Sequence, residues 1–441
     1  MEQRRKNLTQ LFIPICLETL LYMLSGMVDT LMLSSVNDQA VGAVGTANTY
    51  IGIFIIMFSV ISSGMVAVMT QNIGAGRPGV AYQARQLGLT FNAVLGIIVS
   101  LILTFGAGAI LAGVGVADAL MQPAKTYLQI VGGFCILNAL IPICSSYLRA
   151  FGFSKEPLYA SIIGNVINFC LNAFFLFALH KGVAGVATAT VISRIINLVI
   201  VVLLGAVLVK AKQHPERESN RAVMGQIIRI GLPSACETAI YNVSMTLVIR
   251  FLNQMDAQGL NVTARSYTMQ ITNFSYCVGA ALAQANAIMT GWHIGAKEYD
   301  ACDRGTKKAA VIGVIVAVIL ETVFTLCSGW IMQLFSKDPQ MVSLVGKLLA
   351  IDIVLEIGRV TNLVYGQALK TSGDAVFPVV MGVCFMILCS VGGTYLFGIR
   401  LGLLAVGAYI GMAGDECVRA IGMYLRWKSG KWKQKGLVKS R

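Results

Sequence analysis

The chain has 441 residues, of which 56% are hydrophobic and only 12% are charged. A soluble domain carries about 25% charged residues, so this composition excludes an ordinary soluble protein and indicates an integral membrane protein. The net charge of +14 does not indicate nucleic-acid binding, because the basic residues lie in short segments between apolar runs.

Apolar stretches long enough to cross a bilayer as helices, which takes about 20 residues each, follow one another along the whole chain. They are predicted near 8–34, 42–70, 87–112, 125–148, 157–179, 183–209, 228–254, 265–291, 307–335, 340–369, 376–398 and 403–426. We therefore predict an all-α membrane protein with twelve transmembrane helices. The first stretch is too long to be the apolar core of a cleavable signal peptide.

Every second connection between these stretches is basic. The basic set contains Arg4, Arg5, Lys6, Arg77, Arg85, Arg149, Lys155, Lys210, Lys212, Arg217, Arg221, Lys297, Arg304, Lys307, Lys308, Lys370 and the tail from Arg426 to Arg441. Because cytoplasmic loops carry an excess of lysine and arginine, we expect these connections in the cytoplasm. An even number of spans then places both termini there, in a multi-pass protein of the cell membrane.

Nine residues near the start, Pro14 to Tyr22, recur as Pro233 to Tyr241 with proline, glutamate, threonine and tyrosine in register. Further matches keep an offset of 219 to 221 residues, which indicates an internal duplication. The longest polar connection, 210–221, separates six predicted spans on each side. We predict two six-helix bundles, 1–215 and 216–441. Because six is even, the repeats are parallel, related by an axis along the membrane normal.

Carboxylates lie inside the first span of each copy. Glu18, Tyr22, Ser25 and Asp29 fall on one helical face, and a central Asp facing lipid would cost about 2.5–3.5 kcal/mol. Glu237 repeats Glu18, but the position of Asp29 is Val248 in the second copy. Glu18 and Glu237 are therefore interpreted as secondary polar sites. For Glu18 the alternative is snorkelling or capping near the cytoplasmic end, and for Asp29 it is an interfacial residue near the external mouth.

Asn165, Asn168 and Asn172 share one face of the fifth span, whereas their partners in the second copy are Met386, Cys389 and Gly393. Interhelical hydrogen bonding, worth about 1 kcal/mol for each amide, is the alternative to a functional role. Together with Asp29, the three amides predict a coupling site for a cation. The Asp29 carboxylate could carry a proton, or the same oxygens could bind Na⁺.

In the tenth span Asp352, Glu356 and Arg359 are spaced for one face, and Asn362 follows. A structural ion pair is the leading interpretation, and a gating or substrate role is the second. A pliable substrate cavity is predicted to be lined by Tyr50, Tyr267, Met57, Met65 and Asn362, although ordinary packing would use the same residue types.

Nothing in the spans has the spacing of a nucleophile with its base, and the eleven cysteines include no Cys-x-x-Cys pair. We therefore expect neither an enzyme nor a metal or cofactor site. The transported H⁺ or Na⁺ would be the coupling ion. The expected partners are a small-molecule substrate and the lipid bilayer, with no nucleic acid, and we expect a monomer.

Several further motifs follow one another along the chain: Val28-Asp29-Thr30, Gln71-Asn72-Ile73-Gly74-Ala75-Gly76, Arg149-x-Phe151-Gly152 with Pro157, Gly182 to Thr190, and Gly373-Asp374-x-x-Phe377-Pro378. In this order they resemble the multidrug and toxic compound extrusion (MATE) family, most closely its prokaryotic DinF-like branch. The resemblance implies two six-helix bundles around a cavity that opens alternately to each side. It also implies export of amphipathic, often cationic, compounds driven by proton or sodium entry.

The resemblance maps the first-span Asp of the family onto Asp29, and a fifth-span Asn and Asp onto Asn168 and Asn172. The second member is Asn here, so the two-carboxylate arrangement of that branch is incomplete. Other branches place an acid in span seven where this chain has Tyr241, one turn from Glu237. The second candidate function is a lipid-linked oligosaccharide flippase of the same superfamily, whose lumen would need Arg250, Arg359 and Arg419. A channel is a further alternative, which the duplication disfavours.

Overall fold

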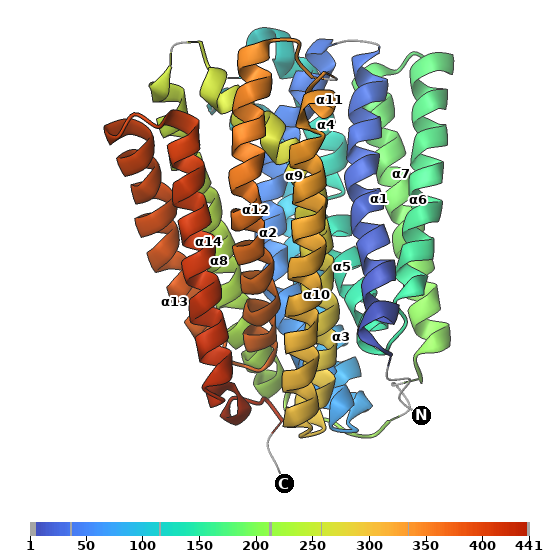
Figure 1. Cartoon of the computed structure of the whole chain (residues 1–441). Coiled ribbons are helices and arrows are strands. Elements are labelled where there is room, and N and C mark those ends of the chain that lie inside the picture. Colours follow the sequence, from blue (N-terminus) through green and yellow to red (C-terminus); the bar gives the residue numbers. More distant parts are fainter. Residues whose placement is uncertain are drawn as a thin grey trace. The chain divides into compact units, whose positions relative to one another are not determined.

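Helices make up nearly all of the computed structural model, and Figure 1 shows them as long rods. The structure describes residues 6–35, 38–113, 116–210, 214–256, 258–333 and 335–438. Five members of the predicted basic set lie outside these ranges, namely Arg4, Arg5, Lys212, Lys439 and Arg441.

The chain divides into two compact units, Met1–Leu232 and Pro233–Arg441. The boundary falls inside helix α8 (Asn220–Met255), later than the predicted boundary between residues 215 and 216. The first turns of α8 belong to the N-terminal unit because glycines allow backbone contact there. A Cβ on Gly64 would lie 2.0 Å from the carbonyl oxygen of Ile227, and one on Gly231 would lie 1.6 Å from that of Val60.

The N-terminal unit contains six predicted spans, five of which are single continuous helical segments. Its elements are α1 (Leu8–Ser34), α2 (Asp38–Gly74), α3 (Pro78–Gly113), α4 (Asp118–Gly133), α5 (Ile136–Ala150), α6 (Lys155–Ala173) with a π-helical end η1 (Phe174–Ala178), and α7 (Gly182–Leu208). The predicted continuous span 125–148 is wrong in one respect, since α4 and α5 meet at a bend of 43°. Two consecutive glycines, Gly132 and Gly133, precede this bend and weaken the helix there.

The C-terminal unit repeats this order. Its elements are the rest of α8, α9 (Leu260–Gly295), α10 (Tyr299–Leu326), α11 (Ser328–Met332), α12 (Pro339–Thr371), α13 (Val376–Phe385), η3 (Met386–Val391), η4 (Thr394–Arg400), α14 (Leu404–Lys428) and η5 (Lys431–Gln434). The segments η1 and η4 occupy equivalent positions in the two units, and both have π-helical geometry. The duplication therefore extends to an irregularity of the backbone.

Within the described residues, seven helices are long and apolar enough to cross a membrane, or eight if the bent pair α4–α5 counts as one span. The helices α8, α9, α12 and α14 fall short of this threshold, and each of them carries buried polar or charged side chains. Each predicted span overlaps a helix or a series of consecutive helical segments. The predicted span 307–335 is divided between α10 and α11, and the predicted span 376–398 among α13, η3 and η4. The chain is thus an all-α membrane protein of two pseudo-symmetric six-helix bundles.

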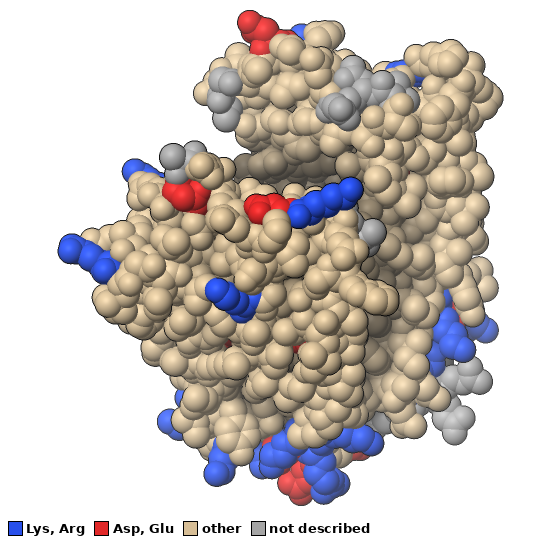
Figure 2. Space-filling view, turned by 45° about the horizontal axis from the view of Figure 1, so that its top comes forward, with Lys and Arg blue, Asp and Glu red and all other residues tan. Residues whose placement is uncertain are grey.

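Uncharged side chains cover most of the face shown in Figure 2, and lysine and arginine gather at its lower edge. A surface of this kind suits contact with lipid hydrocarbon, where a charged side chain is costly.

Val248 on α8 belongs to the apolar core of the C-terminal unit, where it is fully buried with Leu252, Leu348 and Leu349. This is the position that Asp29 occupies in the N-terminal unit. The two bundles share a backbone plan, but their interiors differ at this point.

The repeated glutamates form equivalent ion pairs in the two units. Glu18 on α1 lies 2.5 Å from Nη2 of Arg149 on α5, and Glu237 on α8 lies 2.6 Å from Nζ of Lys370 on α12. Each pair joins the first helix of its bundle to the fourth predicted span. The base that neutralises each glutamate sits at a duplicated position, which makes both pairs part of the common scaffold and excludes solitary snorkelling of Glu18.

We expect the substitution Glu18→Gln to lower the midpoint of thermal unfolding in detergent, because it leaves the Arg149 guanidinium without its counter-charge. The two side chains are 17% and 10% exposed, so the loss should be on the order of 1–3 kcal/mol, below the range for fully buried pairs. The double variant Glu18→Gln/Arg149→Met should recover part of that loss. A single variant as stable as the unmodified protein would contradict a scaffold role for the pair.

Candidate ion-coupling site

Asp29 on α1 and Asn172 on α6 meet inside the N-terminal unit. Nδ2 of Asn172 donates a hydrogen bond to Oδ1 of Asp29 at 2.6 Å, and it lies 3.3 Å from Oδ1 of Asn168 one turn earlier. Asn168 and Asn172 are buried, and Asp29 is half-buried. The structure therefore brings together three of the four residues that the sequence predicts as a coupling site.

Asn165 lies on the same face of α6 but does not reach Asp29. Its Nδ2 donates to the backbone carbonyl of Leu21 at 3.4 Å, two helical turns before Asp29 on α1. The amide of Asn165 thus forms an interhelical hydrogen bond between α6 and α1. Such a bond is the alternative to a functional role for this residue.

One positively charged side chain near this site, on the neighbouring helix α7, was not predicted from the sequence. Arg194, half-buried on α7, lies close enough to Asp29 and to Tyr127 on α4 for electrostatic interaction. Tyr127 is buried and lies within hydrogen-bonding reach of Asn48 on α2. A single arginine inside the apolar run 183–209 is itself a signal of an intramembrane partner for an acid, and it could have identified Arg194.

These residues form a polar cluster around one carboxylate. The carbonyl oxygen of the Asn172 side-chain amide, Oδ1, is buried and has no hydrogen-bond partner among the described residues. Buried polar atoms nearly always have a hydrogen-bond partner. The unpaired oxygen of Asn172 beside a carboxylate therefore indicates that a proton donor or a cation binds between them. A proton on Asp29, or a cation held by the carboxylate and amide oxygens, would provide one.

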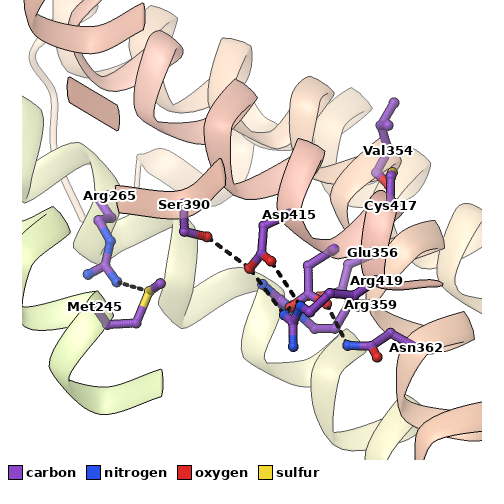
Figure 3. A network of polar contacts seen from close by, with 11 residues as sticks. Met245, Arg265, Val354, Glu356, Arg359, Asn362, Ser390, Asp415, Cys417 and Arg419 are labelled. Carbon is purple, nitrogen blue, oxygen red and sulfur yellow. Dashed lines mark hydrogen bonds and ion pairs between the residues drawn. The ribbon is translucent and has the colours of Figure 1, made fainter. Parts of the chain in front are cut away.

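Two of the predicted charged residues of the tenth span, Glu356 and Arg359, lie in a polar network of the C-terminal unit, which Figure 3 shows. Arg359 forms an ion pair with Glu356 and lies 3.7 Å from Glu416 on α14. Nδ2 of Asn362 donates to Glu416 at 3.0 Å. The expected structural ion pair is present between Glu356 and Arg359. Asp352, by contrast, forms no ion pair with a base of the described chain.

Arg419 completes this network on α14. It lies 2.9 Å from Asp415 and 2.8 Å from Glu416, and the hydroxyl of Ser390 donates to Asp415 at 2.9 Å. Asp415 and Glu416 were not singled out from the sequence, although acids in an apolar run gave the signal. Arg359 and Arg419 are both bound to carboxylates, and Arg250 is exposed on α8. Two of the three arginines that a flippase for pyrophosphate-linked lipids would need are thus already paired with carboxylates.

The predicted cavity residues differ in their surroundings. Tyr50 packs beside the core of the N-terminal unit, and Met57 is exposed. Tyr267 packs against Phe335 with ring centroids 5.4 Å apart. Met65 is fully buried, and its sulfur would lie 2.9 Å from a Cβ on Gly88, so in this conformation it packs between helices and does not line a cavity.

Comparison with known proteins agrees with the duplicated architecture. The family profile described as MatE matches twice, over residues 14–174 and 233–396. The uncharacterized transporter YisQ of Bacillus subtilis is 34% identical over 431 residues, which covers 96% of this chain and 94% of that protein. The DNA damage-inducible protein F of Escherichia coli is 22% identical over 80% of this chain and 77% of its own.

Solved structures show the same fold. A crystal structure described as MATE in the straight conformation superposes with a TM-score of 0.87, at 19% identity, over 97% of this chain and 96% of its own. The resemblance noted from the sequence motifs is confirmed by the family profile, which covers most of both bundles. The chain belongs to the MATE family, whose members are membrane transporters and not enzymes.

Proposed function

We propose that this transporter is a secondary active antiporter that exports amphipathic, cationic small molecules in exchange for H⁺ or Na⁺ by alternating access. The observation that carries the proposal is the Asp29 carboxylate, hydrogen-bonded to Asn172 inside a membrane-spanning bundle and close to Arg194. An ionisable side chain inside a membrane span is energetically costly, and such side chains typically mark the path of an ion or a substrate. Relatives named as probable multidrug resistance proteins, such as NorM of Thermotoga maritima, support the substrate class.

Coupling would work through the partners of Asp29. A proton that binds the carboxylate removes its negative charge, which weakens the attraction to Arg194 on α7. A Na⁺ would compete with the same arginine and with the donor group of Asn172. In either case the contacts of α1 with α6 and α7 change with occupancy. Ion and substrate are coupled if the two conformations differ in affinity for each of them.

The protein would lie in the cell membrane with both termini in the cytoplasm, as the distribution of basic connections indicates. It would act as a monomer, because one chain supplies both repeats of the transport unit. Tyr50 and Met57 of the N-terminal unit and Tyr267 and Asn362 of the C-terminal unit remain the proposed contacts for substrate.

We expect Asp29→Asn to reduce gradient-driven transport at least about tenfold, within the 5–150-fold range that typical coupling energies produce. The amide retains the shape of the side chain but neither binds a proton nor carries charge. The measurement is uptake of a cationic dye into proteoliposomes under separately imposed pH and Na⁺ gradients.

Asp118→Asn is the matched control, since Asp118 is exposed in the first turn of α4 and undergoes the same chemical change. It should transport like the unmodified protein. Full gradient-driven transport by Asp29→Asn would remove Asp29 from the coupling role. If the unmodified protein transports the dye at the same rate with and without either gradient, the proposed antiport is wrong.

A second comparison separates coupling from helix packing. Asn172→Ala removes the hydrogen bond to Asp29 and should lower transport about tenfold, because a hydrogen bond to a charged group is worth about 1.5–3 kcal/mol. Asn165→Ala removes only a bond to the backbone of α1 and should lower it less than threefold. Equal losses in the two variants, measured in the same vesicles, would show that the α6 amides act only in packing.

A further inference from the structure

The chain after α14 folds back as a short strap, residues 429–438, against the end of the C-terminal unit. Gly430 has a left-handed backbone conformation, with φ of +70°, and reverses the direction of the chain before η5. The indole of Trp432 stacks on that of Trp427 with ring centroids 4.1 Å apart, and its Nε1 donates to the Trp427 carbonyl at 2.9 Å. Leu437, near the end of the strap, is buried as well. The strap is therefore a packed part of the unit.

The strap lies over the start of α10. The ring of Trp432 contacts that of Tyr299 with centroids 6.0 Å apart, and Nε1 of Trp427 donates to Asp303 at 2.8 Å. Lys433 of the strap lies close enough to Asp303 for electrostatic interaction. Figure 1 shows the last turns of α14 and the first turns of α10 at the same end of the unit. The basic side chains of the strap and of the first turns of α10 therefore share one surface.

Positive charge on this strap surface, which residues 299–308 and 426–438 form, far exceeds negative charge. The two segments contain eight lysine and arginine residues and only two acids. Lys307 forms a salt bridge with Asp303, and Arg426 forms one with Asp374 of the loop after α12. The other six bases are exposed and form no salt bridge within the described part of the chain. These six are Arg304, Lys308, Lys428, Lys431, Lys433 and Lys435.

Exposed apolar side chains on two helices lead directly to these bases. On α10 the exposed Val311 follows Lys308 by three residues, which places both on one helical face. On α14 Ile421 and Leu425 are each more than half exposed, and Lys428 continues the same face. Such apolar side chains of a membrane protein contact lipid hydrocarbon, and a lysine beside them extends its ammonium group to the level of the lipid headgroups. The strap surface therefore lies at the boundary between hydrocarbon and headgroups.

The N-terminal unit neutralises the charge of the corresponding segment. There the connection after α7, residues 214–219, lies against the start of α3, where Nη1 of Arg217 donates to the carbonyl of Gly79 at 2.8 Å. Glu218 of this connection forms a salt bridge with Arg77 at 2.6 Å. The connection contains two acids and one arginine, whereas the strap contains three lysines and no acid. The excess of positive charge is therefore not part of the duplicated scaffold and belongs to the C-terminal unit alone.

We propose that the strap surface binds the headgroup of an anionic phospholipid through Arg304, Lys308 and Lys428, with the acyl chains along the exposed apolar side chains of α10 and α14. Guanidinium and ammonium groups form charge-assisted hydrogen bonds with phosphate oxygens, and each base near an anionic membrane surface adds to the attraction. A soluble phosphate compound would use the charges but not the adjoining apolar side chains, and this favours the lipid. The bound headgroup joins α10 to the end of α14 and so stabilises the folded protein.

The test uses the purified full-length protein in a neutral maltoside detergent. Phosphatidylglycerol and phosphatidylcholine with the same acyl chains are titrated separately, bound lipid is counted by native mass spectrometry, and thermal unfolding is followed in parallel. We expect phosphatidylglycerol to bind saturably, at least about tenfold more tightly than phosphatidylcholine, and to raise the unfolding midpoint. Glycerol phosphate, which has the charge but no acyl chains, should not displace it at the same concentration.

The double variant Arg304→Gln/Lys428→Gln should weaken binding of phosphatidylglycerol at least about tenfold, because it removes two of the bases that attract the headgroup. Lys155→Gln/Arg221→Gln is the matched control, since it removes one exposed lysine and one exposed arginine from the N-terminal unit, and it should bind like the unmodified protein. Equal affinity for the two lipids, equal losses in the two double variants, or displacement by glycerol phosphate would each overturn the proposal. Because the readout is lipid binding and not transport, the outcome is independent of the proposed antiport.

Discussion

The hydrocarbon interior of the membrane supplies no water to solvate a charge, and the polar interior of this protein is organised around that constraint. Each acid inside a span needs a base, a donor, a proton or a cation. Glu18 and Glu237 have a base at a duplicated position. Asp29 has an amide and a nearby arginine. The acids of the tenth and neighbouring spans outnumber their bases, and this is where the charge balance is incomplete.

The two bundles show which features were retained after the duplication and which diverged. Helix order, the glutamate–base pairs and the π-helical ends are common to both. The interiors are not. Asp29 lies in a cluster of amides and an arginine, whereas its counterpart Val248 is packed among leucines. The function of the transporter is therefore to be sought in the differences between its halves, and the shared features chiefly maintain the fold.

Much of this could be predicted from the sequence, since helical periodicity determines which residues of one helix share a face. It predicted the spans, and it placed Asp29 and Asn172 on faces that could meet. Periodicity within one helix does not reveal which other helix lies opposite. Arg194 is the single charged residue of α7, and Glu321 is the single charged residue in the apolar part of α10, 309–326. Only the packing of α7 and α10 therefore connected them to Asp29 and to Asp352. The bend after α4 depends on two glycines, whose effect no hydropathy pattern records.

The π-helical segment η1 begins two residues after Asn172, and η4 has the same place in the other bundle. A π turn accommodates one more residue than an α turn, so each of these helices stores a surplus residue within its length. If η1 returned to α-helical hydrogen bonding, one side of the helix would turn by about 100° and advance about 1.5 Å relative to the other. Every backbone amide would keep a partner inside the lipid throughout this change. In mechanical terms, the helix can rotate and change its length at a point directly beside Asn172, whose amide binds Asp29.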